Sequence, residues 1–232
     1  TSAYYLYMED GIPIRPLGVF NHNAILEINQ FALSSIEVVK GPVSSIYGPE
    51  AVGGAINFIL QRPTLVPTAR VGVQLDNWGF RRVQFGAGAK IKKFGFYFGG
   101  LNSQQTNSWM ASSDYDKSSI NARLEYNFTE KTRLIGNFVF NKYYSQMSGS
   151  VDSAMFYNRK YVSTSDFTYR KSDATRSRIT LEHDWNNNSK SFITLFQRDN
   201  KHGQNPSYGI RWTPGATTAR GEINSNNFDS YG

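Results

Sequence analysis

The side chains of this sequence that could do chemistry are mainly aromatic and cationic, and they gather in two long stretches, 106–117 and 147–173. Aromatic faces beside positive charge suit the capture of an anionic, partly apolar ligand, because local positive potential speeds association with anions. Basic stretches of this kind would equally contact anionic lipopolysaccharide. The residues singled out as candidate ligand contacts are Trp109, Tyr115, Tyr157, Arg159 and Tyr161.

The sequence contains no arrangement typical of an active site or of a resident metal. His22, His183 and His202 lack HxxH or HExxH spacing, and no nucleophile-elbow or phosphate-binding sequence occurs. Cys is absent, which removes disulfides and thiolate metal sites. We therefore expect no catalysis, no metal site and no cofactor, although a bound ligand could carry a metal. His183 falls on the apolar side of a predicted strand, where we expect a hydrogen-bonded or interfacial role.

Composition leaves the location of the protein open. The 232 residues carry a net charge of +7 and a mean hydropathy of −0.48. The cations are interspersed rather than clustered with stacking aromatics, which argues against nucleic acid as a partner. No run reaches the roughly 18 apolar residues of a membrane helix. A β-barrel nevertheless spans lipid with strands of about ten alternating residues whose mean hydropathy is low.

Alternation of apolar and polar residues predicts about seven strands after Pro63. The clearest runs are 70–76, 82–91, 119–128 and 176–185, and less regular ones lie near 94–105, 132–146 and 190–201. In one example, Ile120, Leu124 and Tyr126 alternate with Arg123 and Glu125. Alternation alone does not separate a membrane barrel from a soluble β-sandwich, because both place apolar residues on one face.

The connections between these strands alternate in length. Residues 92–93, 129–131 and 186–189 are short turns, whereas 106–117 and 147–173 are long loops. Outer-membrane barrels have short periplasmic turns and longer extracellular loops. In a barrel whose first strand rises from the periplasm, every short turn would then lie on the periplasmic side.

Before Pro63 the pattern differs. Tyr5 to Met8 and Ile12 to Ile14 flank Asp10-Gly11, which predicts a hairpin with a type I′ turn. Spacing of apolar residues over 24–32 predicts a short helix. Residues 36–39 form an apolar, β-branched run that ends at Gly41-Pro42, and a second strand is predicted over 56–60, before Arg62-Pro63.

The run from Ile36 to Pro63 carries I-E-V-x-K-G-P, Y-G, G-G-x-I-N and R-P in order. It resembles the second half of the plug domain of TonB-dependent outer-membrane receptors. The resemblance implies a membrane all-β fold, with residues 1–64 forming the carboxy-terminal part of an α+β plug and 65–232 the first part of an antiparallel transmembrane β-barrel. A signal peptide, the front of the plug and the segment that TonB grips are expected to precede Thr1.

The resemblance also implies roles for particular residues. Tyr47 and Gly48 match a position at the plug apex that touches ligand in some members; the alternative is that Tyr47 packs against the barrel wall. A neighbouring apical loop is expected to contribute ligand contacts. Glu37 and Lys40 are expected to form a salt link from plug to barrel. The candidates in the apical loop are Arg15, Phe20, Asn21 and His22.

The expected function is TonB-dependent import of a scarce ligand across the bacterial outer membrane. Lys40-Gly41-Pro42 is the Gly-Pro form of a segment that is often acidic in glycan importers, so the resemblance is nearer to receptors for siderophores, haem or cobalamin. The expected partners are TonB, the lipid bilayer, lipopolysaccharide and a small-molecule ligand. A glycan importer, a signalling receptor and a soluble carbohydrate-binding β-protein are the alternatives.

The facing of one strand tests the membrane placement. If Leu124 meets lipid and Arg123 the lumen, Leu124→Arg should cost about 2–4 kcal/mol near the bilayer midplane and impair assembly. Arg123→Gln should be mild. The yield of folded protein in the membrane measures both, and equal tolerance at the two positions would contradict a membrane barrel.

Overall fold

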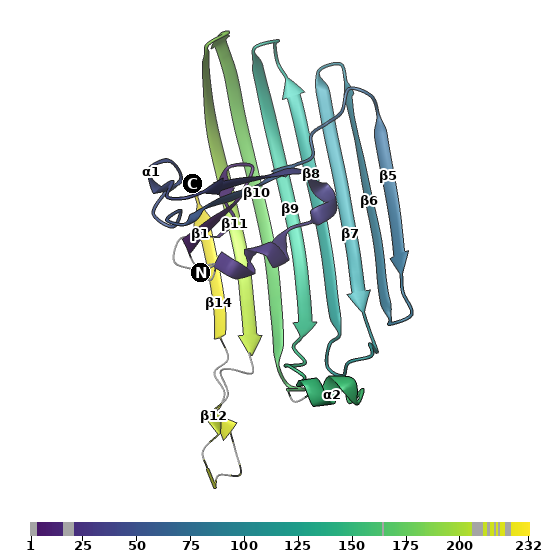
Figure 1. Cartoon of the computed structure of the whole chain (residues 1–232). Coiled ribbons are helices and arrows are strands. Elements are labelled where there is room, and N and C mark those ends of the chain that lie inside the picture. Colours follow the sequence, from purple (N-terminus) through teal and green to yellow (C-terminus); the bar gives the residue numbers. More distant parts are fainter. Residues whose placement is uncertain are drawn as a thin grey trace.

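The computed structural model contains a small sheet, here called the plug, and a large sheet, here called the wall, with the plug lying against one face of the wall (Figure 1). The structure describes residues 4–15, 21–163, 165–205, 211–212, 214–215, 217, 219–220 and 224–232. The domain boundary expected near residue 64 falls in the connection between the two sheets.

The plug is a four-stranded sheet in the order β2-β1-β4-β3. Its strands are β1 (Tyr5–Glu9), β2 (Ile12–Pro13), β3 (Leu33–Lys40) and β4 (Gly54–Leu60), with helix α1 (Ser44–Tyr47) between the last two. Asp10 and Gly11 have φ of 46° and 83°. Two consecutive positive φ values are those of the type I′ turn, which confirms the predicted hairpin.

The helix predicted over 24–32 is instead two short 3-10 helices, η2 (Asn21–Glu27) and η3 (Gln30–Ala32). The interruption has a local cause: the Asn29 side chain accepts a hydrogen bond from the Phe31 backbone N–H at 3.1 Å and starts a new helix there. The apolar face still packs as expected, since Ala24 and Ile28 join the plug core with Tyr7. Burial raises the pKa of the Tyr7 hydroxyl, and the neighbouring Tyr5 adds to the rise, so this core stays uncharged.

The wall is an antiparallel sheet in the order β14-β11-β10-β9-β8-β7-β6-β5. Its strands are β5 (Thr68–Leu75), β6 (Phe80–Ile91), β7 (Phe94–Gln105), β8 (Tyr115–Asn127), β9 (Thr132–Gln146), β10 (Tyr169–Asn186), β11 (Ser189–Asn205) and β14 (Asn224–Tyr231). The first seven confirm the predicted strands, and β14 was not predicted. Helix α2 (Ser153–Tyr157) and the pair β12 (Arg211–Trp212) and β13 (Ala219–Arg220) lie in connections.

The wall buries charged side chains on one face and exposes apolar side chains on the other, which is the reverse of a sheet in a soluble protein. On β8, Arg123 and Glu125 are buried against the plug side, whereas Leu124 is 43% exposed on the outer face. Large apolar side chains remain exposed along the outer face of every strand from β5 to β11, and nothing in the described chain covers them. Examples are Val73, Phe85, Phe98, Ile120, Phe138, Ile179 and Leu195. A sandwich would cover this face, so the structure favours the membrane all-β alternative.

The ends of the wall differ as predicted. The connections at 92–93, 128–131 and 187–188 are short and lie at one end, whereas 106–114 and 147–168 lie at the other with α2 (Figure 1). We call these the short-turn end and the long-loop end. No described helix is long and apolar enough to cross a membrane.

A glycine in the plug provides a test of this fold. Gly54 has φ of +145°, and a Cβ there would clash with the backbone carbonyl oxygen of Val39. Gly54→Ala should therefore destabilise the plug by about 1–3 kcal/mol and make it sensitive to protease. Gly136→Ala is the matched control, since a Cβ at this wall glycine meets nothing within 4 Å. Equal protease resistance of the two variants would contradict the placement of β4.

Candidate functional site

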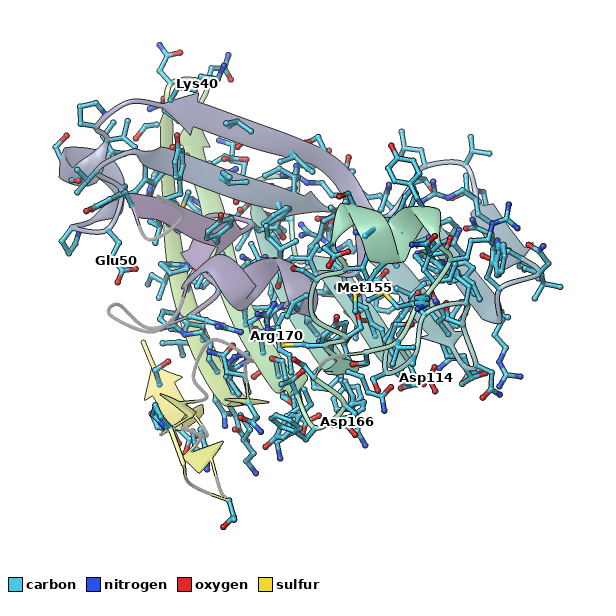
Figure 2. All side chains as sticks on the ribbon, turned by 60° about the horizontal axis from the view of Figure 1, so that its bottom comes forward. Lys40, Glu50, Asp114, Met155, Asp166 and Arg170 are labelled. Atoms are coloured by element: carbon cyan, nitrogen blue, oxygen red, sulfur yellow. The ribbon has the colours of Figure 1, made fainter. Side chains whose placement is uncertain are left out.

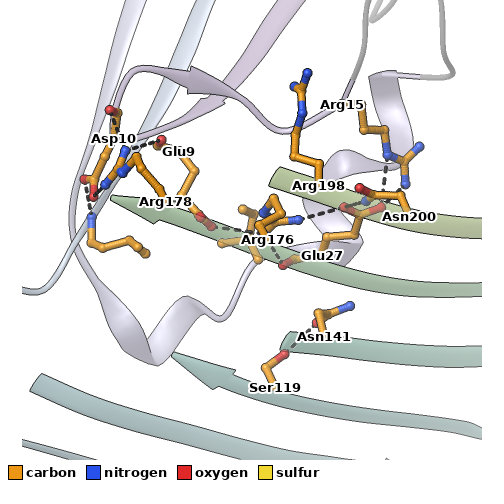
Figure 3. Close-up of polar contacts among 12 residues, drawn as sticks. Glu9, Asp10, Arg15, Glu27, Ser119, Asn141, Arg176, Arg178, Arg198 and Asn200 are labelled. Carbon is orange, nitrogen blue, oxygen red and sulfur yellow. Dashed lines mark hydrogen bonds and ion pairs between the residues drawn. The ribbon is translucent and has the colours of Figure 1, made fainter. Parts of the chain in front are cut away.

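The plug is joined to the wall by a network of buried charges that centres on Glu27, the last residue of η2 (Figure 3). Glu27 is fully buried. Its Oε1 accepts hydrogen bonds from Arg15 Nε at 3.0 Å and Ser172 Oγ at 2.9 Å. Its Oε2 accepts from Arg176 Nη1 at 2.9 Å and Asn200 Nδ2 at 2.7 Å. One plug carboxylate thus binds a plug arginine and three wall side chains on β10 and β11.

The β1–β2 turn forms the second half of this network. Glu9 Oε2 lies 3.0 Å from Arg176 Nη2, so Arg176 bridges Glu9 and Glu27. Asp10 Oδ2 lies 2.7 Å from Arg178 Nη2 and 3.4 Å from Arg123 Nη1. Arg178 also donates to the Asp10 carbonyl oxygen at 3.1 Å. The paired charges offset the cost of burying each of them, which is why the turn is held against the wall.

Arg123 and Arg178 therefore lie on the plug side of the wall, which for Arg123 is the facing expected from the sequence. Arg123 also donates to Glu125 Oε1 at 2.7 Å. Arg123→Gln would leave buried carboxylates partly unpaired, so the structure does not support the mild effect expected from the sequence. Glu182, on the same face of the wall, pairs with Arg133 and Lys190 instead of the plug.

Helix η3 lies against a part of the wall where β6 and β7 carry glycines. Cβ atoms at Gly86 and Gly99 would lie 2.8 Å and 3.0 Å from the Tyr97 hydroxyl, so the two glycines allow the Tyr97 ring to lie against the sheet. Phe31 of η3 approaches Gly86, and the Arg70 guanidinium lies 5.0 Å from the centroid of the Phe31 ring. Together with the charge network, this contact fixes the first half of the plug.

The salt link expected at Glu37 and Lys40 is not formed with the described strands of the wall. Glu37 Oε2 accepts a hydrogen bond from Asn57 Nδ2 at 3.0 Å, within the plug sheet. Lys40 is exposed at the end of β3. The two residues do not reach the wall because β3 is an edge strand of the plug sheet. Its neighbouring residues Ile36 and Val38 are exposed to solvent. Glu9, Asp10 and Glu27 take the linking role.

The apical ligand contacts expected from the sequence divide into three groups. Arg15 is fully buried and bound to Glu27, so it is a structural cation rather than an exposed ligand contact. Phe20 lies outside the described residues, and only the backbone of Asn21 and His22 is described, in η2.

Tyr47 and Gly48 form the third group. Tyr47 ends α1 and is 38% exposed, and the next residue, Gly48, has φ of +108°. Within the described residues the Tyr47 side chain forms no hydrogen bond or ring contact with the wall. Ligand contact by Tyr47 and packing of Tyr47 against the barrel wall both stay predictions.

The aromatic residues expected in the long loops do meet. Trp109 and Tyr161 lie edge to face with centroids 4.6 Å apart, and Phe156 is 6.4 Å from Tyr161. The Ala111 N–H donates to the Tyr161 carbonyl oxygen at 3.2 Å, which ties the two loops together. We call Trp109, Phe156, Tyr157 and Tyr161 the loop aromatic cluster. Figure 2 looks toward this end, where Asp114, Met155 and Asp166 mark the loops.

Two further candidates from the same loops differ in their surroundings. Tyr157 is 82% exposed beside Phe156, and Arg159 is exposed two residues later. Tyr115 is not a loop residue. It begins β8, and its hydroxyl lies 2.8 Å from Ser103 Oγ, so it belongs to the wall.

The described residues contain no group of three His, Cys, Asp or Glu that could hold a metal. His183 is hydrogen-bonded, the first of the two roles expected of it: Nδ1 lies 2.8 Å from Thr132 Oγ1, and the ring packs edge to face on Trp185 with centroids 4.4 Å apart. The charges and rings described above anchor the plug to the wall and tie the two long loops together.

Comparison with known proteins finds relatives for the plug and for the chain as a whole. The profile of the TonB-dependent receptor plug domain matches residues 1–55. The ferrichrome outer membrane transporter/phage receptor of Escherichia coli (strain K12) is 25% identical over 211 residues, which are 83% of this chain and 27% of that protein.

Solved structures share the fold. The open form of the ferric-catecholate import receptor Fiu from E. coli K12 has a TM-score of 0.70 at 18% identity, over 99% of this chain and 37% of that chain. The receptor FpvA of P. aeruginosa, bound to a pyoverdine and iron, has a TM-score of 0.71 at 19% identity, over 97% and 32%. The chain thus spans about a third or less of the length of these relatives.

The central carboxylate of the network can be tested directly. Glu27→Gln removes the charge that faces Arg15 and Arg176, and breaking a buried pair in this way should cost about 3–5 kcal/mol. Thermal unfolding of the full-length protein should begin at a lower temperature, with the plug becoming protease-sensitive first. Glu130→Gln, in an exposed turn, is the matched control and should change stability by less than about 0.5 kcal/mol. Equal behaviour of the two would contradict the anchoring role of Glu27.

Proposed function

We propose that this chain, which belongs to the TonB-dependent receptors of the bacterial outer membrane, forms the plug-bearing part of a transporter that imports a metal chelate with energy delivered through TonB. The main support for this proposal is the way the plug is bound. Buried ion pairs hold it against the polar face of the wall, and the other face of the wall is apolar and exposed. Such a plug closes a path that would otherwise be open. The relatives are named as transporters and receptors, which supports transport without a covalent reaction.

The loop aromatic cluster supports a chelate as the ligand. Trp109 and Tyr161 present ring faces and edges at the long-loop end, with the exposed cations Arg159 and Lys160 close by in the chain. Rings contribute large apolar contact area at low entropic cost, and exposed cations attract anions. A ferric siderophore combines an apolar or aromatic framework with negative charge. The relatives bind ferrichrome, ferric catecholates and pyoverdine according to their names, so we place this ligand in the same class.

The distribution of plug contacts supports a mechanism for opening. Strands β1 and β2 and helices η2 and η3 are fixed by the Glu27 network and by Phe31, whereas β3 and α1 expose Ile36, Val38 and Ile46. Separating the ion pairs would leave buried charges unpaired, and each unpaired charge costs several kcal/mol. Movement of the β3 and α1 side leaves them intact. We infer that pulling by TonB displaces this less constrained side and opens a passage beside the fixed half.

Uptake by whole cells tests the function. A strain that lacks the full-length protein, complemented or not, is given a panel of radiolabelled ferric siderophores, haem and cobalamin. We expect accumulation of one ferric siderophore only in the complemented strain, abolished when TonB is absent. Uptake that persists without TonB would contradict the proposed energy coupling, and binding of a glycan in place of any chelate would contradict the ligand class.

The loop aromatic cluster gives the specific prediction. Trp109→Ala should weaken binding of the imported chelate about ten-fold, the effect of losing a central aromatic contact. Trp185→Ala is the matched control, because Trp185 is exposed on the wall near the short-turn end. A fluorescence titration of the purified full-length protein measures both. Unchanged affinity in Trp109→Ala would remove the cluster from the binding site.

A further inference from the structure

A hollow of about 680 Å³ lies on the plug side of the wall at the short-turn end, and the import mechanism proposed above does not use it. It is bounded by the β6–β7 turn, the β8–β9 turn and the end of β10. The lining residue Asn127 follows Arg123 and Glu125 at the strand period of two. Its partner across the sheet is Arg133, which also lines the hollow. The hollow therefore faces the lumen and not the lipid.

The residues around this space are mainly basic. The plug crosses the wall strands away from the short turns, so the hollow lies beyond the plug (Figure 1). Its cations come from the two turns and from strands β6 and β9, and with the space between them we call them the basic lumen hollow: Lys90, Lys92, Lys93, Lys131 and Arg133.

Hydrogen bonds hold the shape of the basic lumen hollow. Lys93 Nζ donates to the Phe128 carbonyl oxygen at 3.2 Å, and the Asn127 N–H donates to the Lys93 carbonyl oxygen at 2.8 Å. The Asp184 N–H donates to the Lys131 carbonyl oxygen at 2.8 Å, which joins the end of β10 to the β8–β9 turn. The cations are therefore carried on a fixed backbone frame.

The positive charge of the basic lumen hollow is only partly balanced. Arg133 pairs with Glu182, and the lining acid Asp184 lies 3.7 Å from Lys190. In the part of the chain that the structure describes, none of the four lining lysines forms an ion pair, and Glu130 is the only other acid in the lining. Such a space attracts an anion.

A further cation lies between the plug and the basic lumen hollow. Arg62 comes just after β4, at the start of the connection to the wall, and it is exposed. It lines a smaller hollow of about 290 Å³ beside the β1–β2 turn, together with Glu182. Because Glu182 pairs with Arg133, the two hollows adjoin. The R-P sequence that ends the plug motif thus supplies a cation on the way from the plug to the basic lumen hollow.

The volume and charge of the basic lumen hollow suit a small anionic ligand. Sites for small molecules have volumes of roughly 300–1,000 Å³. Strand β3 pairs with β4 as far as Leu33 opposite Leu60. A passage opened on the β3 side of the plug would therefore lead past Arg62 toward the basic lumen hollow. An anionic chelate that has passed the plug would meet these cations before it leaves the barrel.

We propose that the basic lumen hollow is an exit site, which binds an anionic ferric chelate after it has passed the plug and before its release at the short-turn end. The exit site rests on the proposed function and adds a second binding position to it. Lys92, Lys93 and Lys131 donate charge-assisted hydrogen bonds to the oxygen atoms of the chelate. Because salt screens exposed charges, the bound chelate is also released readily.

Protection of lysines from acetylation tests the exit site in the purified full-length protein. An N-hydroxysuccinimide ester acetylates the protein, and peptide mass spectrometry reads the rate at each residue. The probe is the ferric complex of a hexadentate tris-catecholate, which is a trianion. At about ten times its dissociation constant it should slow acetylation of Lys92, Lys93 and Lys131 about ten-fold. The protection should fall as salt rises.

Matched controls separate a site from general attraction of anions. Lys142 and Lys201 are exposed on the outer face near the long-loop end, and they should react at the same rate with and without the probe. A neutral ferric tris-hydroxamate of similar size should not protect the hollow, and millimolar inorganic phosphate should protect it much less than the trianion. Absence of protection at the hollow lysines, or equal protection by the neutral complex, by phosphate or at Lys142, overturns the proposal.

The variant Lys131→Gln gives a second measurement at residues that remain in place. It should weaken the protection of Lys92 and Lys93 several-fold, whereas Lys142→Gln should leave it unchanged; equal effects of the two variants would also overturn the exit site. Neither readout depends on TonB or on uptake. A protein that imports a chelate without this protection would lack the exit site alone, and protection without TonB-dependent uptake would contradict the transport function alone.

Discussion

A carboxylate that is buried away from water needs cations or hydrogen-bond donors beside it. Glu27 is fully buried, and its need for such partners determines how the plug lies against the wall. It binds Arg15 within the plug and Arg176, Asn200 and Ser172 on the wall. Because Arg176 is shared with Glu9, the β1–β2 turn and η2 are positioned by the same cation. The orientation of the plug against β10 therefore follows from charge balance more than from apolar packing.

The same condition explains the inverted faces of the wall. The charges that receive the plug occupy one face of each strand, so the apolar residues of the alternating pattern occupy the other, where Leu124 and Phe138 are exposed. The resulting mean hydropathy of −0.48 is that of a soluble chain. A surface of this kind is compatible with lipid contact, as is expected of the outer-membrane receptors that the chain resembles.

Much of the wall could be predicted from the sequence, because a strand has a period of two and a one-residue error reverses its faces. The position of Arg123 on the face opposite Leu124 followed from that pattern. The partners could not be predicted: Glu27 lay within an expected helix and Glu9 and Asp10 within an expected turn, and no local signal shows which wall arginine each one meets. Arg15 was misassigned for the same reason. Tyr115 was assigned to a loop because β8 begins before its alternation becomes regular.

The pairing of β1 with β4 also restricts the order of assembly. β1 is the central neighbour of β2 and β4, and its register with β4 is parallel, from Tyr5 opposite Gly54 to Glu9 opposite Phe58. In the sequence the two strands are separated by β2, η2, η3, β3 and α1, and closing so long a loop is slow. During synthesis β1 has no main partner until β4 has been made. Strand β1 is therefore among the last of the four strands of this sheet to become ordered, and its edge stays exposed until then.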